Sequence, residues 1–297
     1  MESNKKDNIS IESVKKDIQQ EILDKIQKFD IKNEKCEDNL VATVKYINDE
    51  WNFKQNNILS NDRIINKQNT IIKGKVNDRI VIILESPHKD EYSEQITAPA
   101  MGTTGENINK YLLDILNKKI VKPQSDEKEY DVILMNAIQY QTSLGIDTEY
   151  FRDRVWLTLW NKEDLRKEFI KRLEGYNADI VFNFCTNGSH KKDLIYILDK
   201  KRNSSNMTFQ YIDSLNLKIK RKEDNNLYID EKVVCKVTKK DNTNVYLLKE
   251  FVQTAIEESK SLKCNIKIFK GPHPSSWISK DSEEYEESFI DKIEFIK

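Results

Sequence analysis

The chain has 297 residues, of which 38% are hydrophobic and 33% charged, so it can bury the core of one large or two small domains. This composition excludes collagen-like, mucin-like and wholly disordered chains. Lys and Arg number 49 against 50 Asp and Glu, which leaves a net charge of −1 and no overall field that attracts polyanions. Any nucleic acid must therefore be held by a local patch.

The four cysteines are far apart and form no CxxC pair. This spacing favours neither a disulfide framework nor a zinc ribbon, and it fits a reducing cytosol. The first thirty residues are charged and lack the apolar core of a signal peptide, and no apolar run approaches the length of a membrane span. We therefore expect a cytoplasmic protein without a membrane partner.

Residues 1–75 are predicted to form a helical accessory region. Apolar side chains recur every four residues at Val14, Ile18, Ile22 and Ile26. A second set alternates spacings of four and three, at Leu40, Val44, Ile47 and Trp51. Both spacings place apolar side chains on one face of an α-helix.

Four short apolar runs after residue 75 predict buried strands, at residues 79–84, 131–136, 179–184 and 265–269. Runs of this kind are typical of strands covered on both faces in a parallel sheet. Amphipathic helical patterns lie between the runs. Their apolar positions are Ile108, Tyr111, Leu112, Ile115 and Leu116; Leu165, Phe169 and Leu173; Leu194, Ile195 and Leu198; and Leu247, Phe251, Val252 and Ala255.

Residues 202–245 interrupt the alternation of strand and helix. They are polar and contain the turn signals Asp-Asn-Asn at 224–226 and Asp-Asn at 241–242. This pattern predicts one or two inserted β-hairpins. The sequence therefore predicts an α/β domain over residues 76–297, with a three-layer α/β/α arrangement around a mostly parallel four-stranded sheet.

The residue types that carry chemistry gather in the loops after these strands, where all three histidines, His88, His190 and His273, are found. The carboxyl ends of parallel strands open into one crevice, so we expect a ligand site there. Glycine-rich dinucleotide and P-loop fingerprints are absent, which disfavours NAD or ATP as a cofactor.

These loops carry a family resemblance. Residues 84–88 read Leu-Glu-Ser-Pro-His, residues 99–105 read Pro-Ala-Met-Gly-Thr-Thr-Gly, a strand ends at Asn136, and residues 273–275 read His-Pro-Ser. In order and in strand context they resemble the motifs of the uracil-DNA glycosylase superfamily, closest to the branch whose first motif is Gly-Glu-x-Pro. The resemblance spans about residues 78–297 without the insertion. It implies a DNA glycosylase that needs neither metal nor cofactor and acts on single- or double-stranded DNA, and we expect a monomer.

The resemblance assigns the catalytic roles to Glu85 and His273. A carboxylate near C1′ of the sugar stabilises an oxocarbenium-like transition state and orients the attacking water. A histidine aimed at the carbonyl oxygen of the departing base stabilises the charge that develops there. Each has a simpler alternative, because Glu85 could cap a helix or pair with a cation and His273 could fix a turn.

The same resemblance implies a pocket for a flipped base, formed by Asn136, Ala100, Met101 and His88, in which the Asn136 amide reads the pairing edge. Asn136 could instead cap a strand end, and His88 has at most a supporting role. Contacts to DNA are expected from Ser86, Pro87, Asn187, Ser189, His190, Lys191, Ser275, Ser276 and Trp277. For Trp277, the alternative to a wedge in the vacated base stack is a core anchor.

Two positions depart from the family pattern. Leu84 replaces the glycine of the first motif, and Ala100 stands where the family has a phenylalanine that stacks on uracil. A missing ring removes stacking of about 1–3 kcal/mol and widens the pocket. We therefore expect a bulkier modified pyrimidine as substrate, in DNA repair or in defence against modified foreign DNA. Iron–sulfur clusters occur in this branch, but the cysteine spacing predicts none here.

Two other classes of function fit the sequence. The chain could be a non-catalytic nucleic-acid-binding module on the same fold, although it retains both Glu85 and His273. It could also be a hydrolase of free nucleotides or nucleosides that uses the same α/β crevice and a carboxylate. An acidic surface around the two catalytic candidates would favour this last class over DNA.

Overall fold

The computed structural model describes residues 34–61, 63–65, 77–92, 96–120, 128–143, 152–153, 155–160, 163–188, 219–221, 226–229, 232–236, 244–245, 247–259, 262–277 and 288–297. The candidates Ser189, His190 and Lys191 lie outside these residues, as do the helical patterns expected at 14–26 and 194–198.

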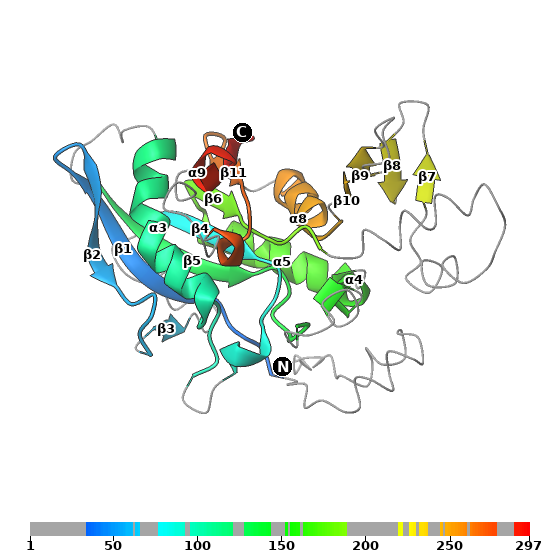
Figure 1. The fold of residues 1–297 in the computed structure, drawn as a ribbon, viewed down its shortest axis with the longest axis horizontal. Coiled ribbons are helices and arrows are strands. Elements are labelled where there is room, and N and C mark those ends of the chain that lie inside the picture. The colour runs from blue at the N-terminus through cyan, green and yellow to red at the C-terminus, as the bar shows by residue number, and fades with distance from the viewer. Residues whose placement is uncertain are drawn as a thin grey trace, which may run out of the picture.

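A mixed sheet organises the protein, with strands in the order β12-β11-β6-β4-β5-β1-β2 and β3 paired to β1 (Figure 1). Its centre is parallel and consists of β4 (Asp78–Leu84), β5 (Glu129–Asn136), β6 (Ile180–Asn183) and β11 (Lys267–Lys270). These are the strands that the apolar runs predict. The prediction of four strands is nevertheless too small, because antiparallel strands extend the sheet at both edges.

The N-terminal edge corrects the helical prediction for residues 40–51. They form β1 (Asn39–Ile47) and β2 (Glu50–Asn56), while β3 (Ile64–Ile65) pairs with β1. Asn48 and Asp49 both have positive φ, at 54° and 66°, as the centre of a tight hairpin requires. Because β1 pairs with β5, strands from both sides of residue 75 share one sheet.

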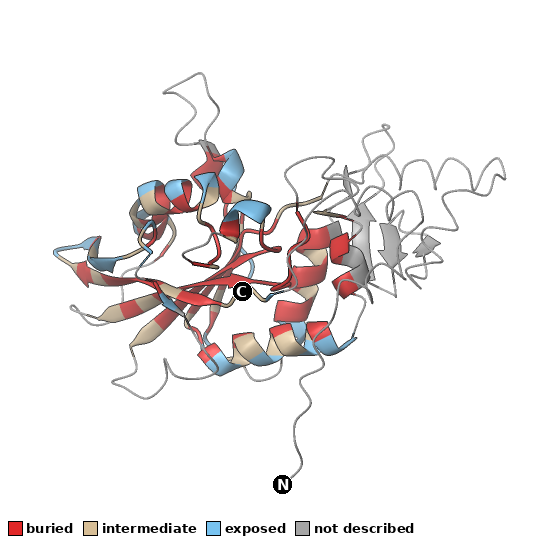
Figure 2. Ribbon diagram, turned by 90° about the horizontal axis from the view of Figure 1, so that it is seen from below, coloured by how far each residue is buried: buried red, intermediate tan, exposed pale blue. Residues whose placement is uncertain are grey.

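Helices cover both faces of the sheet. Ile80, Ile82 and Leu84 of β4 pack in one apolar cluster with α3 (Thr103–Lys119) and with α9 (Ser288–Asp291). The alternate residues Val81 and Ile83 pack with α4 (Val155–Trp160), α5 (Glu163–Tyr176) and α8 (Leu247–Glu258). Figure 2 shows the buried residues concentrated on the strands and on the helix sides that face them. The helical patterns predicted at 108–116, 165–173 and 247–255 are confirmed.

The inserted segment contains a second, antiparallel sheet in the order β10-β9-β8-β7. Its strands are β7 (Ile219–Arg221), β8 (Asn226–Ile229), β9 (Lys232–Lys236) and β10 (Asn244–Val245). The predicted hairpins are therefore present within residues 219–245. At the other end of the main sheet, β12 (Glu294–Phe295) pairs antiparallel with β11.

Gly105, in the first turn of α3, allows a close backbone approach that fixes the loop before the helix. A Cβ at this position would lie 2.0 Å from the carbonyl oxygen of Ala100. Ala100 is fully buried and has a positive φ of 56°. Its carbonyl cannot move without shifting this strained loop, so residue 105 must be glycine.

We predict that Gly105→Ala lowers the free energy of unfolding by about 2 kcal/mol, because the added methyl group overpacks the loop. The matched control is Gly175→Ala in α5, where a Cβ would meet nothing within 4 Å. The control should raise stability by up to about 1 kcal/mol, since alanine favours a helix. Urea unfolding measures both changes, and equal stability of the two variants would contradict the packing described for Gly105.

Candidate active site

The candidate site lies where the winding of the parallel strands reverses. The chain passes from β4 to its neighbour β5, and then returns to β6 on the opposite side of β4. At such a switch point the loops leaving two adjacent strands diverge and leave room for a ligand. The loops after β4 and β6 flank this point, and the loop after β11 follows next to β6. Three of the loops singled out in the sequence therefore meet at one edge.

Glu85 follows β4 directly and is 6% exposed. Its Oε2 accepts a hydrogen bond of 3.1 Å from the backbone N–H of Thr186, which follows β6 across the switch point. Its own carbonyl accepts from Ile138 N at 3.0 Å and from Trp156 Nε1 at 2.8 Å. The carboxylate is therefore held in a fixed position inside a largely buried site.

The imidazole of His273 faces this carboxylate. His273 Nε2 lies 3.4 Å from Glu85 Oε2, and the two side chains are 17% and 8% exposed. His273 follows β11 through the short segment Gly271–Pro272. The two residues assigned to catalysis from the sequence are thus in contact, although 188 positions of the chain separate their numbers.

The protonation of His273 follows from its other ring nitrogen. His273 caps the 3₁₀ helix η4 (Pro274–Ser276), and its Nδ1 accepts from the backbone N–H of Ser275 at 3.2 Å. A backbone N–H can only donate, so Nδ1 carries no proton and Nε2 carries the hydrogen in the neutral ring. Burial lowers the pKa of His273, opposed by Glu85 and assisted by Arg152 and Lys249. The site therefore presents a neutral imidazole whose protonated Nε2 lies 3.4 Å from the Glu85 carboxylate.

Ser275 and Ser276, predicted to contact DNA, are exposed and stabilise this loop. Ser275 Oγ lies 2.8 Å from His273 Nδ1, and Ser276 Oγ donates to the carbonyl of His273 at 2.7 Å. Asn187 is half-buried and follows Thr186. These residues surround the Glu85–His273 pair at the protein surface.

Asn136 and Ala100 occupy a buried region on the β5 side of the site. Asn136 is 1% exposed, and its Nδ2 lies 3.7 Å from Cys36 Sγ, while its Oδ1 has no hydrogen-bond partner. Ala100 N donates to Glu91 Oε1 at 2.7 Å, and the second oxygen of Glu91 also has no partner. Burial raises the pKa of Glu91 to about 8. Two polar atoms in this region are therefore buried without a partner.

The remaining base-pocket candidates are less well placed. Met101 is half-buried beside Ala100. His88 caps the 3₁₀ helix η2 (Lys89–Glu91) by accepting from Asp90 N at 3.3 Å, and its Nδ1 lies 3.1 Å from the Asp90 carboxylate. These contacts of the His88 imidazole are local to η2 and support its role as a cap.

Ser86 and Pro87 are buried, which corrects the prediction that they press on a DNA backbone. The hydroxyl of Ser86 hydrogen-bonds to that of Thr142. A phosphate contact needs a position at the surface, and neither residue has one. Both residues instead pack in the turn that follows Glu85 after β4.

Trp277 is also corrected, because it is a core residue and not a wedge. It is 2% exposed and stacks on Phe289 with ring centroids 4.8 Å apart. Tyr111 and Phe184 meet its edges, and its Nε1 donates to the carbonyl of Pro272 at 3.0 Å. The side chain anchors the His273 loop from below, so it cannot enter a base stack.

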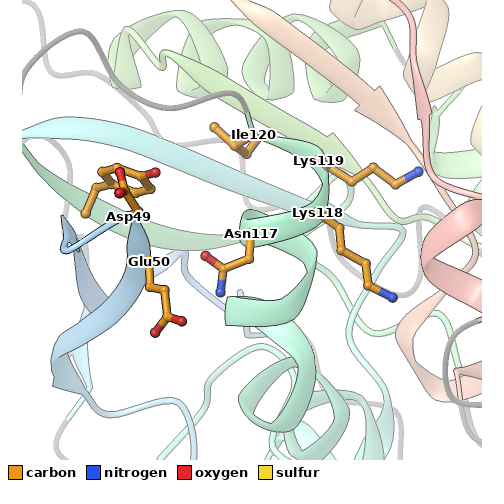
Figure 3. Close-up of a pocket in the computed structure, with 7 residues that line it drawn as sticks. Asp49, Glu50, Asn117, Lys118, Lys119 and Ile120 are labelled. Atoms are coloured by element: carbon orange, nitrogen blue, oxygen red, sulfur yellow. The ribbon is translucent and has the colours of Figure 1, made fainter.

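An open pocket lies elsewhere, at the amino ends of the parallel strands (Figure 3). It has a volume of about 530 Å³ and is lined by Tyr46, Asp49, Glu50, Asn117, Lys118, Lys119 and Ile120. Tyr46 N donates to the carbonyl of Lys128, just before β5 begins. The pocket therefore lies at the amino ends of the parallel strands, whereas Glu85 lies at their carboxyl ends.

Sequence reasoning missed four side chains that shape the site. Arg63 and Glu91 hold the loop at Ala100, Cys36 contacts Asn136, and Lys249 contacts the loop that carries His273. Glu91 could have been suspected, because it is a carboxylate six positions after Glu85. The other three have no local signal, since only the tertiary fold brings them to the site.

The described part of the chain contains no group of three or more His, Cys, Asp and Glu side chains arranged to hold a metal ion. None of its helices combines the length and apolar character needed to cross a bilayer. No family model, curated protein or solved structure matches the chain with statistical significance.

We predict that Trp277→Ala lowers the free energy of unfolding by about 3–5 kcal/mol, because it leaves a large cavity in the aromatic cluster. The control is Phe295→Ala, an aromatic residue that is 62% exposed. Thermal or urea unfolding gives the two values. If Trp277→Ala lowered the free energy of unfolding no more than the control did, the buried position of Trp277 would be wrong. Trp277 would then again be a candidate for contact with DNA.

Proposed function

We propose that this protein is a DNA glycosylase that hydrolyses the N-glycosidic bond of a flipped, modified pyrimidine nucleotide. The observation that carries the proposal is the contact between the Glu85 carboxylate and the neutral imidazole of His273 at the switch point of the sheet. This reaction requires a buried carboxylate that stabilises positive charge and an N–H donor beside it. The ordered sequence motifs that resemble the uracil-DNA glycosylase superfamily support the same conclusion.

The fold is proposed to be the three-layer arrangement of that superfamily. Helices on both faces of the sheet and a parallel centre in the order β5-β4-β6-β11 are compatible with it. We further propose that the protein acts on DNA as a monomer and needs no metal for the bond-breaking step. Repair of damaged bases and defence against modified foreign DNA require the same catalytic groups.

Glu85 acts on the sugar in this proposal. As the base departs, positive charge develops at C1′ and the ring oxygen, and the Glu85 carboxylate stabilises it and orients a water molecule for attack. The Thr186 N–H donates to Oε2 and holds that oxygen on the β6 side of the site. The water supplies hydroxide to C1′, and its proton passes to the carboxylate.

His273 acts on the leaving base. Its Nε2–H donates a hydrogen bond to the base carbonyl oxygen on which negative charge develops, and Ser275 N keeps the ring in the required tautomer. At 3.4 Å the carboxylate and imidazole leave no space for a nucleotide between them. Substrate must therefore separate the pair, and the Nε2–H then donates to the base.

Features of the region around Ala100 support the hypothesis that the substrate base is bulkier than uracil. A methyl group stands where the related motif has a stacking ring, and Glu91 and Arg63 hold this loop by hydrogen bonds to its backbone. Asn136 Oδ1 and Glu91 Oε2 are buried without a partner, which is costly unless a ligand supplies one. A flat polar base that hydrogen-bonds to both atoms satisfies them.

We predict that Glu85→Gln abolishes base release, with a loss of at least about 100-fold in the single-turnover rate, while DNA binding persists. The control is Glu50→Gln, which replaces an exposed carboxylate on β2 at the opposite edge of the sheet and should leave the rate unchanged. Mass spectrometry of bases released from DNA containing uracil or bulky modified cytosines measures the activity.

The same assay separates the competing functions. Release from free nucleosides but not from DNA would identify a nucleoside hydrolase, and DNA binding without release of any base would identify a non-catalytic module. Efficient and selective release of uracil would remove the bulky-base hypothesis. A wild-type rate in Glu85→Gln would contradict the mechanism.

The lowered pKa of His273 predicts the acid side of the pH profile. An ordinary histidine becomes protonated below about pH 6.5. Because burial lowers the pKa of His273, the ring stays neutral to a lower pH than a free imidazole does. The acid limb of the single-turnover rate profile should therefore have its midpoint below about pH 6.5. A rate that is already halved at about pH 6.5 would show that His273 titrates normally and would refute this prediction.

A further inference from the structure

Lys249 is a buried cation that contacts the loop carrying His273. It lies on α8 and is 6% exposed, and its Nζ donates to the carbonyl oxygen of Gly271 at 2.5 Å. Gly271 opens the segment that carries His273, and it has no room for a side chain, since a Cβ would lie 2.8 Å from Phe184 and Ile293. The ammonium group therefore holds the backbone by a hydrogen bond two residues before His273.

The position of Lys249 is itself fixed by a network around β6. Asn183, the last residue of β6, donates from Nδ2 to the Lys249 carbonyl at 3.2 Å and to Gln253 Oε1 at 3.0 Å. The carbonyl of Asn183 accepts from Gly271 N at 3.2 Å. The end of β6, the first turns of α8 and the His273 loop are thus joined into one hydrogen-bonded unit.

The charge of Lys249 has no ion-pair partner within the described residues. Its neighbour Glu250 pairs instead with Lys270 at 3.1 Å. A buried ammonium group is costly when only a carbonyl oxygen contacts it, so the charge calls for another favourable interaction. Lys249 interacts electrostatically with Glu85 and Cys185, while Lys270 opposes it, and burial lowers its pKa to about 8. With a pKa of about 8, the ammonium form prevails at neutral pH and interacts electrostatically with the proposed catalytic carboxylate.

We propose that Lys249 is a positioning residue that holds the His273 loop through Gly271 and supplies a fixed positive charge behind the Glu85–His273 pair. This inference rests on the proposed glycosylase function for its catalytic consequence. The positive charge stabilises the anion that develops on the leaving base. It also disfavours a second positive charge on His273, so the ring remains a neutral donor.

Three charged groups act on the imidazole of His273 from the elements around it. Glu85, from the loop after β4, favours protonation, whereas Arg152 and Lys249 oppose it. Arg152 is paired with Asp153 at 2.7 Å. Removal of the Lys249 charge leaves burial and Arg152 to oppose Glu85, so the pKa of His273 should rise.

Two substitutions separate the charge from the hydrogen bond. Lys249→Met removes both, and Lys249→Gln removes the charge but keeps an N–H donor that can face Gly271. The control is Lys263→Met, because Lys263 pairs with Asp179 next to the start of β6, at the opposite edge of the sheet. The chain has only three histidines, so imidazole NMR signals can be assigned with His88→Gln and His190→Gln variants.

The NMR titration tests the inference without any need for enzymatic activity. We expect a higher His273 pKa in Lys249→Met and Lys249→Gln than in the wild-type chain, and no change in Lys263→Met. Loss of a buried charge without an ion pair should not prevent folding, and the histidine spectra report on folding directly. An unchanged His273 pKa in both Lys249 variants would overturn the proposal.

Catalysis gives the second readout. Lys249→Met should lower the single-turnover rate of base release by about 100-fold, with DNA binding retained. The acid limb of its pH profile should move to higher pH, and Lys249→Gln should show the same movement. A rate loss without that movement would limit Lys249 to holding the loop and would overturn its electrostatic role. If the wild-type chain releases no base, the proposed function fails, whereas the His273 titration still decides whether Lys249 acts on the imidazole.

Discussion

A carboxylate and an imidazole that meet at a largely buried site impose most of the constraints on this structure. The Glu85 side chain is 6% exposed, so its surroundings must replace the water that its polar atoms have lost. The Thr186 N–H supplies one hydrogen bond, and the His273 ring lies next to the same oxygen. Both partners come from loops after other parallel strands. The contact therefore depends on the pairing of β4 with β6 and of β6 with β11, which brings the three strand ends together.

The loop that carries His273 is held from several directions. Ser275 N fixes the tautomer of the ring, Trp277 anchors the end of η4 in the aromatic cluster, and Lys249 binds the carbonyl of Gly271. On the other side of the crevice, Glu91, Arg63 and Gly105 confine the backbone at Ala100. Two rigid walls thus border a region in which Asn136 Oδ1 and Glu91 Oε2 lack partners. Rigid positioning of a few polar groups around an unsatisfied region is what a specific site requires.

The strands and helices of the parallel centre could be predicted from the sequence, because continuous apolar runs and amphipathic periods reflect burial directly. The edge at β1 and β2 could not, because Leu40, Val44 and Ile47 fit a helical period as well as a strand. The β-branched residues and the Asn48–Asp49 turn decided in favour of a hairpin. The Glu85–His273 pair could be anticipated from strand ends and motif order. The burial of Trp277, Ser86 and Pro87, and the place of Lys249, depend on packing between distant segments that no local pattern encodes.

The most direct test of the central claim is a crystal structure of the complex with DNA that contains a bulky modified cytosine on a 2′-fluorinated sugar, which resists hydrolysis. The account predicts an extruded nucleotide with C1′ beside Glu85 and the base near Ala100 and Asn136. His273 Nε2 should have left Glu85 and moved within hydrogen-bond distance of the base carbonyl. A complex in which DNA binds at another surface, with the Glu85–His273 contact intact and no nucleotide in the crevice, would contradict it.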